Sequence, residues 1–197
     1  MFLKVGWEQS LVRWRAFWDG QVADRPPVLI HRMASFASDI SGSREVGPNT
    51  VLARNLAFYD PTRNETLLDQ MEKGLEARSD MPDDMAPAIV AGGGVHFAGA
   101  AFGAPVQVTA SMLTAEPIIH DWSQAKGLRF DLGNEWVQRA LGLARQLVGR
   151  SNGRYAVTVG LLEGPSDICA ALRGITELAE DVYSRPEEVR NLAEMAA

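Results

Sequence analysis

Residues 155–162 read YAVTVGLL, and the polar sequence EGP follows them at 163–165. A short run rich in β-branched and aromatic residues that ends at glycine and proline is typical of a buried β-strand. Residues 134–148, which precede it, carry apolar side chains at helical spacing, and an Asn-Gly pair at 152–153 breaks that helix. A further helix is expected to begin at residue 166 or 167. Helix, buried strand and helix in this order predict the repeating unit of an α/β fold.

The same alternation extends toward the N-terminus. Residues 62–77 carry leucine and methionine at helical spacing, with Asn64 as the predicted N-cap. Residues 83–90 (DDMAPAIV) run from acidic to apolar and predict a second strand, although Pro87 argues against an ordinary central strand. Residues 28–30 (VLI), which follow two prolines, predict the first strand. Strands that alternate with helices predict a parallel sheet with short loops after each strand.

Shorter elements fill the remaining sequence. Residues 105–108 and 117–119 are predicted as extended pieces on either side of a turn. From Ile175 onward the spacing predicts helices with a break at Pro186, which suits the first turn of a helix that Ser184 caps.

Three tryptophans mark the N-terminal segment. Trp7, Trp14 and Trp18, together with Leu11, fall three or four residues apart, so they share one face of a helix over residues 7–19. Such a stripe predicts a lid helix packed across the end of a larger body. A platform for an aromatic ligand is the alternative.

The composition excludes several classes of function. The chain has 197 residues, a net charge of −6 and a pI near 5.1, so it lacks a basic stripe that would neutralise nucleic-acid phosphates. Its length suits one domain. Cys169 is the single cysteine, which rules out an internal disulfide and favours a reducing compartment. Because the sequence has no secretion signal and no run of about 18 apolar residues, we expect a cytoplasmic protein without membrane association.

Several fragments, in order along the chain, carry a resemblance to a known family. They are DRPPV at 24–28, FGAPV at 102–106, PII at 117–119, GP at 164–165, LRG at 172–174 and PEEV at 186–189. Together they resemble the N-terminal portion of the uroporphyrinogen-decarboxylase-like superfamily, which also contains corrinoid- and coenzyme M-type methyltransferases. The resemblance implies a TIM (β/α)8 barrel with its active-site residues at the carboxyl ends of the strands.

A complete barrel of this type has eight strands and roughly 250 residues. Residues 1–197 are therefore expected to form the N-terminal part of one truncated α/β barrel domain, a partial TIM barrel with about three barrel strands and an N-terminal helical extension. Truncation predicts an open sheet edge and an exposed apolar inner face, through which the chain would self-associate. By itself such a chain is expected to be inactive.

Two positions depart from the decarboxylases of the superfamily. Gly94 falls where those enzymes place an aspartate, and Ala171 falls near their tyrosine. Both differences argue against porphyrinogen decarboxylation. In the methyltransferase branch, the resemblance implies a zinc site of one His and two Cys on later strands, beyond Ala197. This chain itself therefore supports no metal or other cofactor, and the implied partners are a small-molecule substrate and a corrinoid protein.

Three candidate substrate-binding residues follow the first two predicted strands. Arg32 and His31 come directly after the first strand, where either can bind a substrate carboxylate or phosphate. His96 follows three glycines at 92–94, whose backbone amides can approach an anion. A structural histidine at position 31, an ion pair between Arg32 and a nearby acid, and tight packing at the glycines are the alternatives.

Two carboxylates at the end of the strongest strand are the candidate catalytic residues. Glu163 and Asp167 flank Gly164-Pro165, and either can act as a general acid or base. The alternative for Asp167 is that it caps the following helix. Asp83 and Asp84 precede the second strand and are predicted to form a solvated turn, and His120-Asp121 a hydrogen-bonded turn.

Three functions remain open from the sequence. The first is a methyltransferase-like enzyme acting on a small substrate. The second is a decarboxylase or lyase that anchors a small carboxylate on Arg32; a zinc requirement would distinguish the methyltransferase from it. The third is a non-catalytic fragment that acts by assembly with another polypeptide or with itself.

Overall fold

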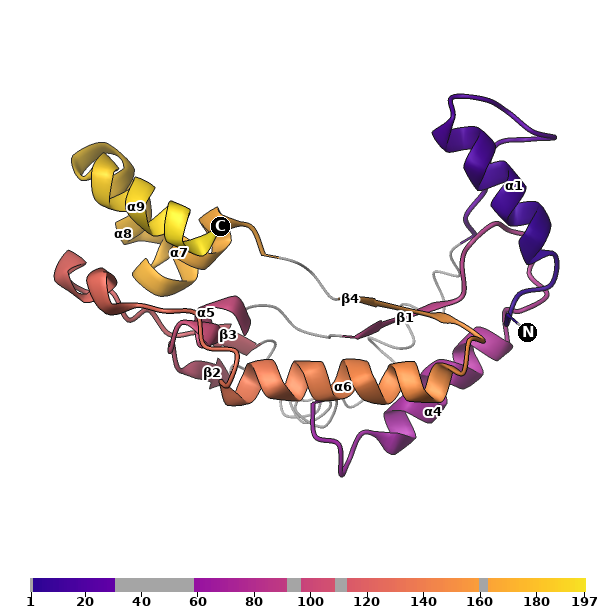
Figure 1. Ribbon diagram of the computed structural model, residues 1–197, viewed down its shortest axis with the longest axis horizontal. Helices are drawn as coiled ribbons and strands as arrows, with labels where there is room; N and C mark the ends of the chain where they lie inside the picture. Colours follow the sequence, from indigo (N-terminus) through magenta and orange to yellow (C-terminus); the bar gives the residue numbers. More distant parts are fainter. Residues whose placement is uncertain (1, 31–58, 92–96, 109–112, 160–162) are drawn as a thin grey trace, which may run out of the picture.

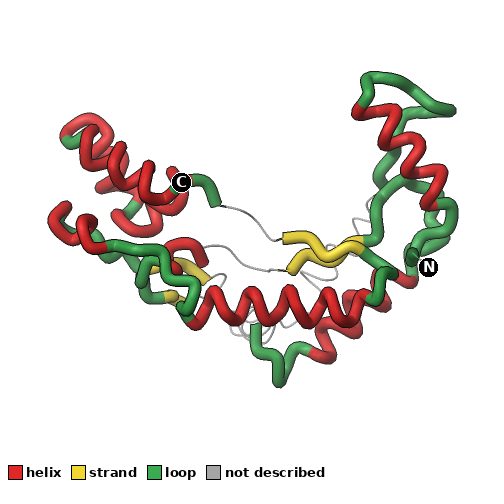
Figure 2. The backbone as a smooth tube through the Cα atoms, viewed as in Figure 1, coloured by secondary structure: helices red, strands yellow, loops and turns green. Residues whose placement is uncertain are grey.

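The computed structural model describes residues 2–30, 59–91, 97–108, 113–159 and 163–197. Its elements in chain order are α1 (Trp7–Trp18), α4 (Glu65–Glu76), β1 (Ala88–Ala91), α5 (Phe97–Ala101), β2 (Val106–Val108), β3 (Leu113–Ala115), the 3-10 helix η1 (Trp122–Gly127), α6 (Glu135–Ser151), β4 (Ala156–Val159), α7 (Pro165–Arg173), α8 (Ile175–Ser184) and α9 (Pro186–Ala196). They lie along an open arc, with α1 at one end and the group α7, α8 and α9 at the other (Figure 1). The strands of the described ranges form two separate pairs (Figure 2).

β1 and β4 form a parallel pair, as the alternation of strands and helices predicts. The register places Ile89 opposite Val157, and the Ala156 N–H donates to the Pro87 carbonyl oxygen at 2.9 Å. The chain between the two strands contains α5, the antiparallel pair of β2 and β3, and α6. This connection is long enough to join two parallel strands. The strand predicted within residues 83–90 is confirmed over Ala88–Ala91, after Pro87. The other predicted strand is confirmed over residues 156–159, and its last three residues lie outside the described ranges.

Helices α4 and α6 cover one face of this pair. Their apolar sides meet the strands in a first hydrophobic core made of Tyr59, Leu68, Ile89, Leu143, Leu147 and Tyr155. Ile89 is 2% exposed, whereas the next residue, Val90, is 43% exposed because successive side chains of a strand point to opposite faces. Thr158, the partner of Val90, is also exposed. Within the described residues, the second face of the pair is therefore open to solvent.

A second hydrophobic core lies under α7, α8 and α9. It is made of Phe102, Ala104, Ile119, Trp122, Ile168, Cys169, Leu172 and Leu192. Cys169 is buried on α7, as predicted, and burial raises the pKa of its thiol. Arg173 donates to the Asp181 carboxylate at 2.7 Å and to the Ile119 carbonyl oxygen at 2.8 Å, which ties α7 to α8 and to the chain before η1.

The predicted helices are confirmed, with small changes at their ends. Residues 62–77 contain α4, and residues 134–148 contain most of α6, which runs three residues further and ends at Asn152 in the left-handed conformation (φ 44°). Asn134 caps α6 with its side chain, which accepts the Trp136 N–H. α7 begins at Pro165, one residue before the predicted start.

Two predicted caps have other roles. The Asn64 side chain makes no cap hydrogen bond but exchanges hydrogen bonds with the Gln146 side chain at 2.8 and 3.1 Å, which joins α4 to α6. Ser184 is the last residue of α8 and donates to the Glu180 carbonyl oxygen, while Arg185 takes the N-cap position of α9. Pro186 is the first residue of α9, as predicted.

Two predicted extended pieces are not strands. At 117–119, the Ile118 and Ile119 N–H groups both donate to the Leu172 carbonyl oxygen near the end of α7, so they are not available for a sheet. At 28–30, the Val28 and Ile30 N–H groups donate to the carboxylates of Asp84 and Asp83. The three side chains at 28–30 are 37–47% exposed, so this segment is not the buried first strand that its sequence predicts.

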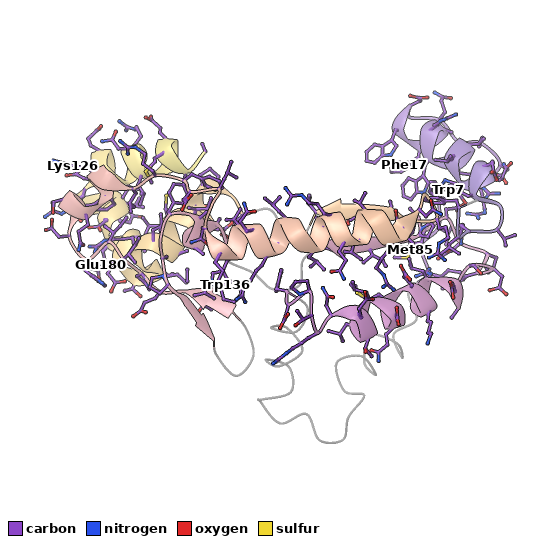
Figure 3. The ribbon with its side chains drawn as sticks, turned by 60° about the horizontal axis from the view of Figure 1, so that its bottom comes forward. Trp7, Phe17, Met85, Lys126, Trp136 and Glu180 are labelled. Atoms are coloured by element: carbon purple, nitrogen blue, oxygen red, sulfur yellow. The ribbon has the colours of Figure 1, made fainter. Side chains whose placement is uncertain are left out.

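The N-terminal helix is confirmed as α1, over Trp7–Trp18, and Gly20 follows it with a positive φ of 68°. It stands at the amino ends of β1 and β4 (Figure 1) and beyond one end of α6 (Figure 3, where Trp7 and Phe17 are labelled). The Trp14 indole N–H donates to the Asp84 carbonyl oxygen at 2.7 Å, but Trp18 is 77% exposed. The described residues therefore cover only part of the tryptophan stripe.

Candidate functional site

The carboxyl ends of β1 and β4 lie at the same edge of the sheet because the two strands are parallel. β4 ends at Val159, and Glu163 and Gly164 lead from it into α7. Both strands point toward the end of the arc that holds α5 and α7 (Figure 1). This edge is where a parallel α/β protein places ligands, and the two carboxylates selected from the sequence follow β4 in the chain.

Glu163 and Asp167 differ in their surroundings. Both side-chain oxygens of Glu163 are withdrawn from solvent. The Asp167 side chain is exposed, and its Oδ2 accepts the Gly164 N–H at 3.1 Å, across the first turn of α7. Asp167 thus has the capping contact that was its alternative interpretation, and Glu163 has the more desolvated carboxylate.

The three candidate substrate-binding residues lie outside the described ranges. They are His31, Arg32 and His96. Of the five candidates, Glu163 and Asp167 lie in the described ranges, four residues apart in the chain. The placement of the other three at this edge stays a prediction.

No family model, curated protein or solved structure matches this chain.

Metal ligands are not grouped in the part of the chain that the structure describes. Within those ranges, no three His, Cys, Asp or Glu side chains are placed to hold a metal ion. The zinc site that the resemblance implies has no ligand set here, and no chemical step is derived through it. Among the same residues, no helix has the length and apolar character needed to cross a bilayer.

An apolar pocket of about 300 Å³ lies elsewhere, between the start of α4 and the first half of α6. Tyr59, Asn64 and Leu143 line it, and Arg139 and Gly142 border it. None of its lining residues belongs to β1, β4 or α7, so it is separate from the carboxyl edge.

Asp83 and Asp84 are buried, contrary to the predicted solvated turn. Asp83 is 3% exposed and Asp84 is fully buried. Lys4 forms an ion pair with Asp83, and Arg78 does so at 2.6 Å. Arg13 and Arg25 pair with the two oxygens of Asp84 at 2.9 and 2.5 Å. The prediction failed because these cations lie far from the aspartates in sequence, apart from Arg78, and a local pattern does not reveal them.

These contacts lower the pKa of both carboxyl groups. Burial acts to raise the pKa of Asp84, but hydrogen bonds from the Val28 N–H and from the side chains of Arg13, Ser10 and Arg25 outweigh burial and hold it far below its usual range. Burial likewise acts to raise the pKa of Asp83. There, Lys4 and the Ile30 N–H outweigh it, so this pKa is also lowered.

We expect this pair to make stability depend on acid. Because the folded pKa values lie below those of unfolded Asp, the stability that the pair contributes is complete above about pH 4 and is lost as the pH falls through the lowered values. The free energy of unfolding of wild type should exceed that of Asp84→Asn by a constant amount between about pH 5 and 7. The difference should shrink below about pH 4, as urea unfolding followed by circular dichroism would measure. A difference that stays constant down to about pH 2 would contradict this account.

Proposed function

We propose that this chain is a sector of an α/β barrel similar to the uroporphyrinogen-decarboxylase-like superfamily, from its methyltransferase-like branch, and that it helps to bind and convert a small substrate. The observation that carries the proposal is the carboxyl edge of the β1–β4 pair, where Glu163 follows β4 with its carboxylate oxygens out of water. Enzymes with parallel α/β barrels place catalytic groups at this edge.

The one-sided cover of the strands supports the barrel part of the proposal. An open parallel sheet is normally covered by helices on both faces, whereas the strands of a barrel carry helices on the outside and side chains alone inside. Helices α4 and α6 cover one face of the described pair, and the other face, with Val90 and Thr158, is open. That face corresponds to the inside of the proposed barrel.

The proposed reaction transfers a methyl group from a methylated corrinoid to a small thiol. In such a transfer the corrinoid would supply the methyl group, and the thiol would lose its proton as its sulfur accepts that group. Glu163 is the proposed acceptor of that proton. Arg32, His31 and His96 are the proposed contacts to an anionic group of the substrate, and Asp167 accepts the Gly164 N–H at the start of α7.

The test uses the protein made from the complete reading frame that contains this chain. With zinc, methylcobalamin and 2-mercaptoethanol, we expect loss of the methylcobalamin absorbance and formation of the methyl thioether. Zinc removal by a chelator should abolish both. Release of carbon dioxide from small carboxylic acids without a zinc requirement would replace this proposal with the decarboxylase alternative.

Exposed apolar residues on the strands favour a second candidate, which is assembly. Val90 is 43% exposed and Val159 is 69% exposed. A chain with such a sheet can associate with a second polypeptide or with itself. Light scattering of the 197-residue chain would test for assembly, and a urea unfolding curve would test for cooperative unfolding. A monodisperse monomer that unfolds cooperatively would rule this candidate out.

A further inference from the structure

Residues 7–30, which comprise α1 and the segment after it, form an N-terminal arm with few buried residues. Ser10 is the only buried residue of this arm. Phe17 and Trp18 are 50% and 77% exposed, and neither hydrophobic core contains a residue of the arm. Apolar burial, which holds most helices to their proteins, therefore contributes little to docking of this arm against the described body.

The arm is held instead by polar contacts, and most of them converge on Asp84. The Asp84 carboxylate pairs with Arg13 and Arg25 and accepts hydrogen bonds from the Ser10 side chain and the Val28 N–H. Its backbone takes part as well: the Asp84 N–H donates to the Val28 carbonyl oxygen at 2.7 Å, and its carbonyl oxygen accepts the Trp14 indole N–H. One residue of the body thus contacts five residues of the arm.

The neighbouring Asp83 adds a smaller number of contacts. Its carboxylate accepts the Ile30 N–H at 3.2 Å, and Arg78, which pairs with it, also donates to the Ile30 carbonyl oxygen at 3.2 Å. The remaining cation at Asp83 is Lys4, which lies before the arm. Asp24 also pairs with Arg13, but Asp24 belongs to the arm and does not connect it to the body.

We propose that the arm is a strap that undocks as a unit from the amino end of the sheet, with Asp84 as its latch. A buried carboxylate with two guanidinium partners is stable only while its partners are in place, so its contacts are made or lost together. Since no core residue holds the arm, it opens without unfolding of α4 and α6. Opening frees the segment from Asp83 to Pro87, which leads directly into β1. The strap therefore controls how firmly the amino end of β1 is held.

Hydrogen exchange of the 197-residue chain tests the proposal. Asp84→Asn keeps the size of the side chain and removes its charge. We expect amide exchange of residues 11–18 to accelerate by about tenfold or more, through an opening that leaves α4 and α6 protected and that depends less on urea than exchange in α4 and α6 does. Asp24→Asn is the matched control, because it removes a carboxylate partner of Arg13 that lies within the arm. It should leave the exchange of α1 within about threefold of wild type.

Two outcomes would overturn the strap. In the first, the amides of α1, α4 and α6 in Asp84→Asn exchange with the same opening free energy and the same urea dependence, which would make the arm part of one cooperative unit. In the second, exchange in α1 does not change. If Asp84→Asn fails to fold, Arg25→Gln is the second variant, because Arg25 lies outside both cores and should accelerate exchange in α1 through the same local opening. One common opening free energy for the three helices, or no change in α1, would reject the proposal in that variant too.

Discussion

If the proposed methyl transfer is the reaction, we expect Glu163→Gln to lower its turnover number by about 100-fold in the protein made from the complete reading frame. The substitution keeps the shape of a side chain whose oxygens are withdrawn from solvent, but an amide does not accept the thiol proton. A loss of proton transfer of this kind acts on the chemical step. We therefore expect kcat to fall while KM for the thiol changes little, as steady-state assays would measure.

Asp167→Asn is the matched control for this prediction. Asp167 lies four residues further along, is exposed, and its carboxylate already accepts the Gly164 N–H, which an amide oxygen can also accept. Its kcat should stay within about threefold of wild type. Equal losses of kcat in both variants would mean that the effect of Glu163→Gln is not specific to proton transfer by Glu163. Unchanged turnover in Glu163→Gln would remove Glu163 from the reaction.

Leu147→Ala lowers the free energy of unfolding by about 3 kcal/mol. Leu147 is fully buried in the first core, where α6 packs on α4 and β1, so the truncation leaves a cavity among Leu68, Ile89 and Tyr155. Helix propensity favours alanine slightly, so the loss comes from packing. Urea denaturation followed by circular dichroism would measure it.

Leu141→Ala is the control on the same helix. Leu141 is 37% exposed and belongs to neither core, so its truncation should cost less than about 1 kcal/mol. Similar losses for both leucines would mean that α6 does not bury the face that the first core requires.

The elements that the sequence predicts well are those whose residues interact with near neighbours. Apolar spacing places α6, and the run of β-branched and aromatic residues from Tyr155 places β4. Each of these features depends on a local pattern. Such features are visible in a window of 10 to 20 residues.

The elements that the sequence predicts poorly depend on partners far away in the chain. Asp84 lies 71 residues from Arg13, and Asn64 lies 82 residues from Gln146. Val28 belongs to an apolar run typical of a strand, but its N–H is taken by the Asp84 carboxylate. Propensity yields to such tertiary contacts because a buried carboxylate must be satisfied. The candidate site is similar: the sequence selects Glu163 and Asp167 alike, and the structure adds that the Glu163 carboxylate is withdrawn from solvent whereas Asp167 is exposed.

The crystal structure of the protein made from the complete reading frame tests the central claim most directly. The proposal predicts that β1 and β4 are adjacent strands of a closed barrel of parallel strands, with α4 and α6 outside, Val90 and Thr158 facing the interior, and Glu163 at the carboxyl rim. An open sheet with helices packed on both faces of β1 and β4 would contradict it.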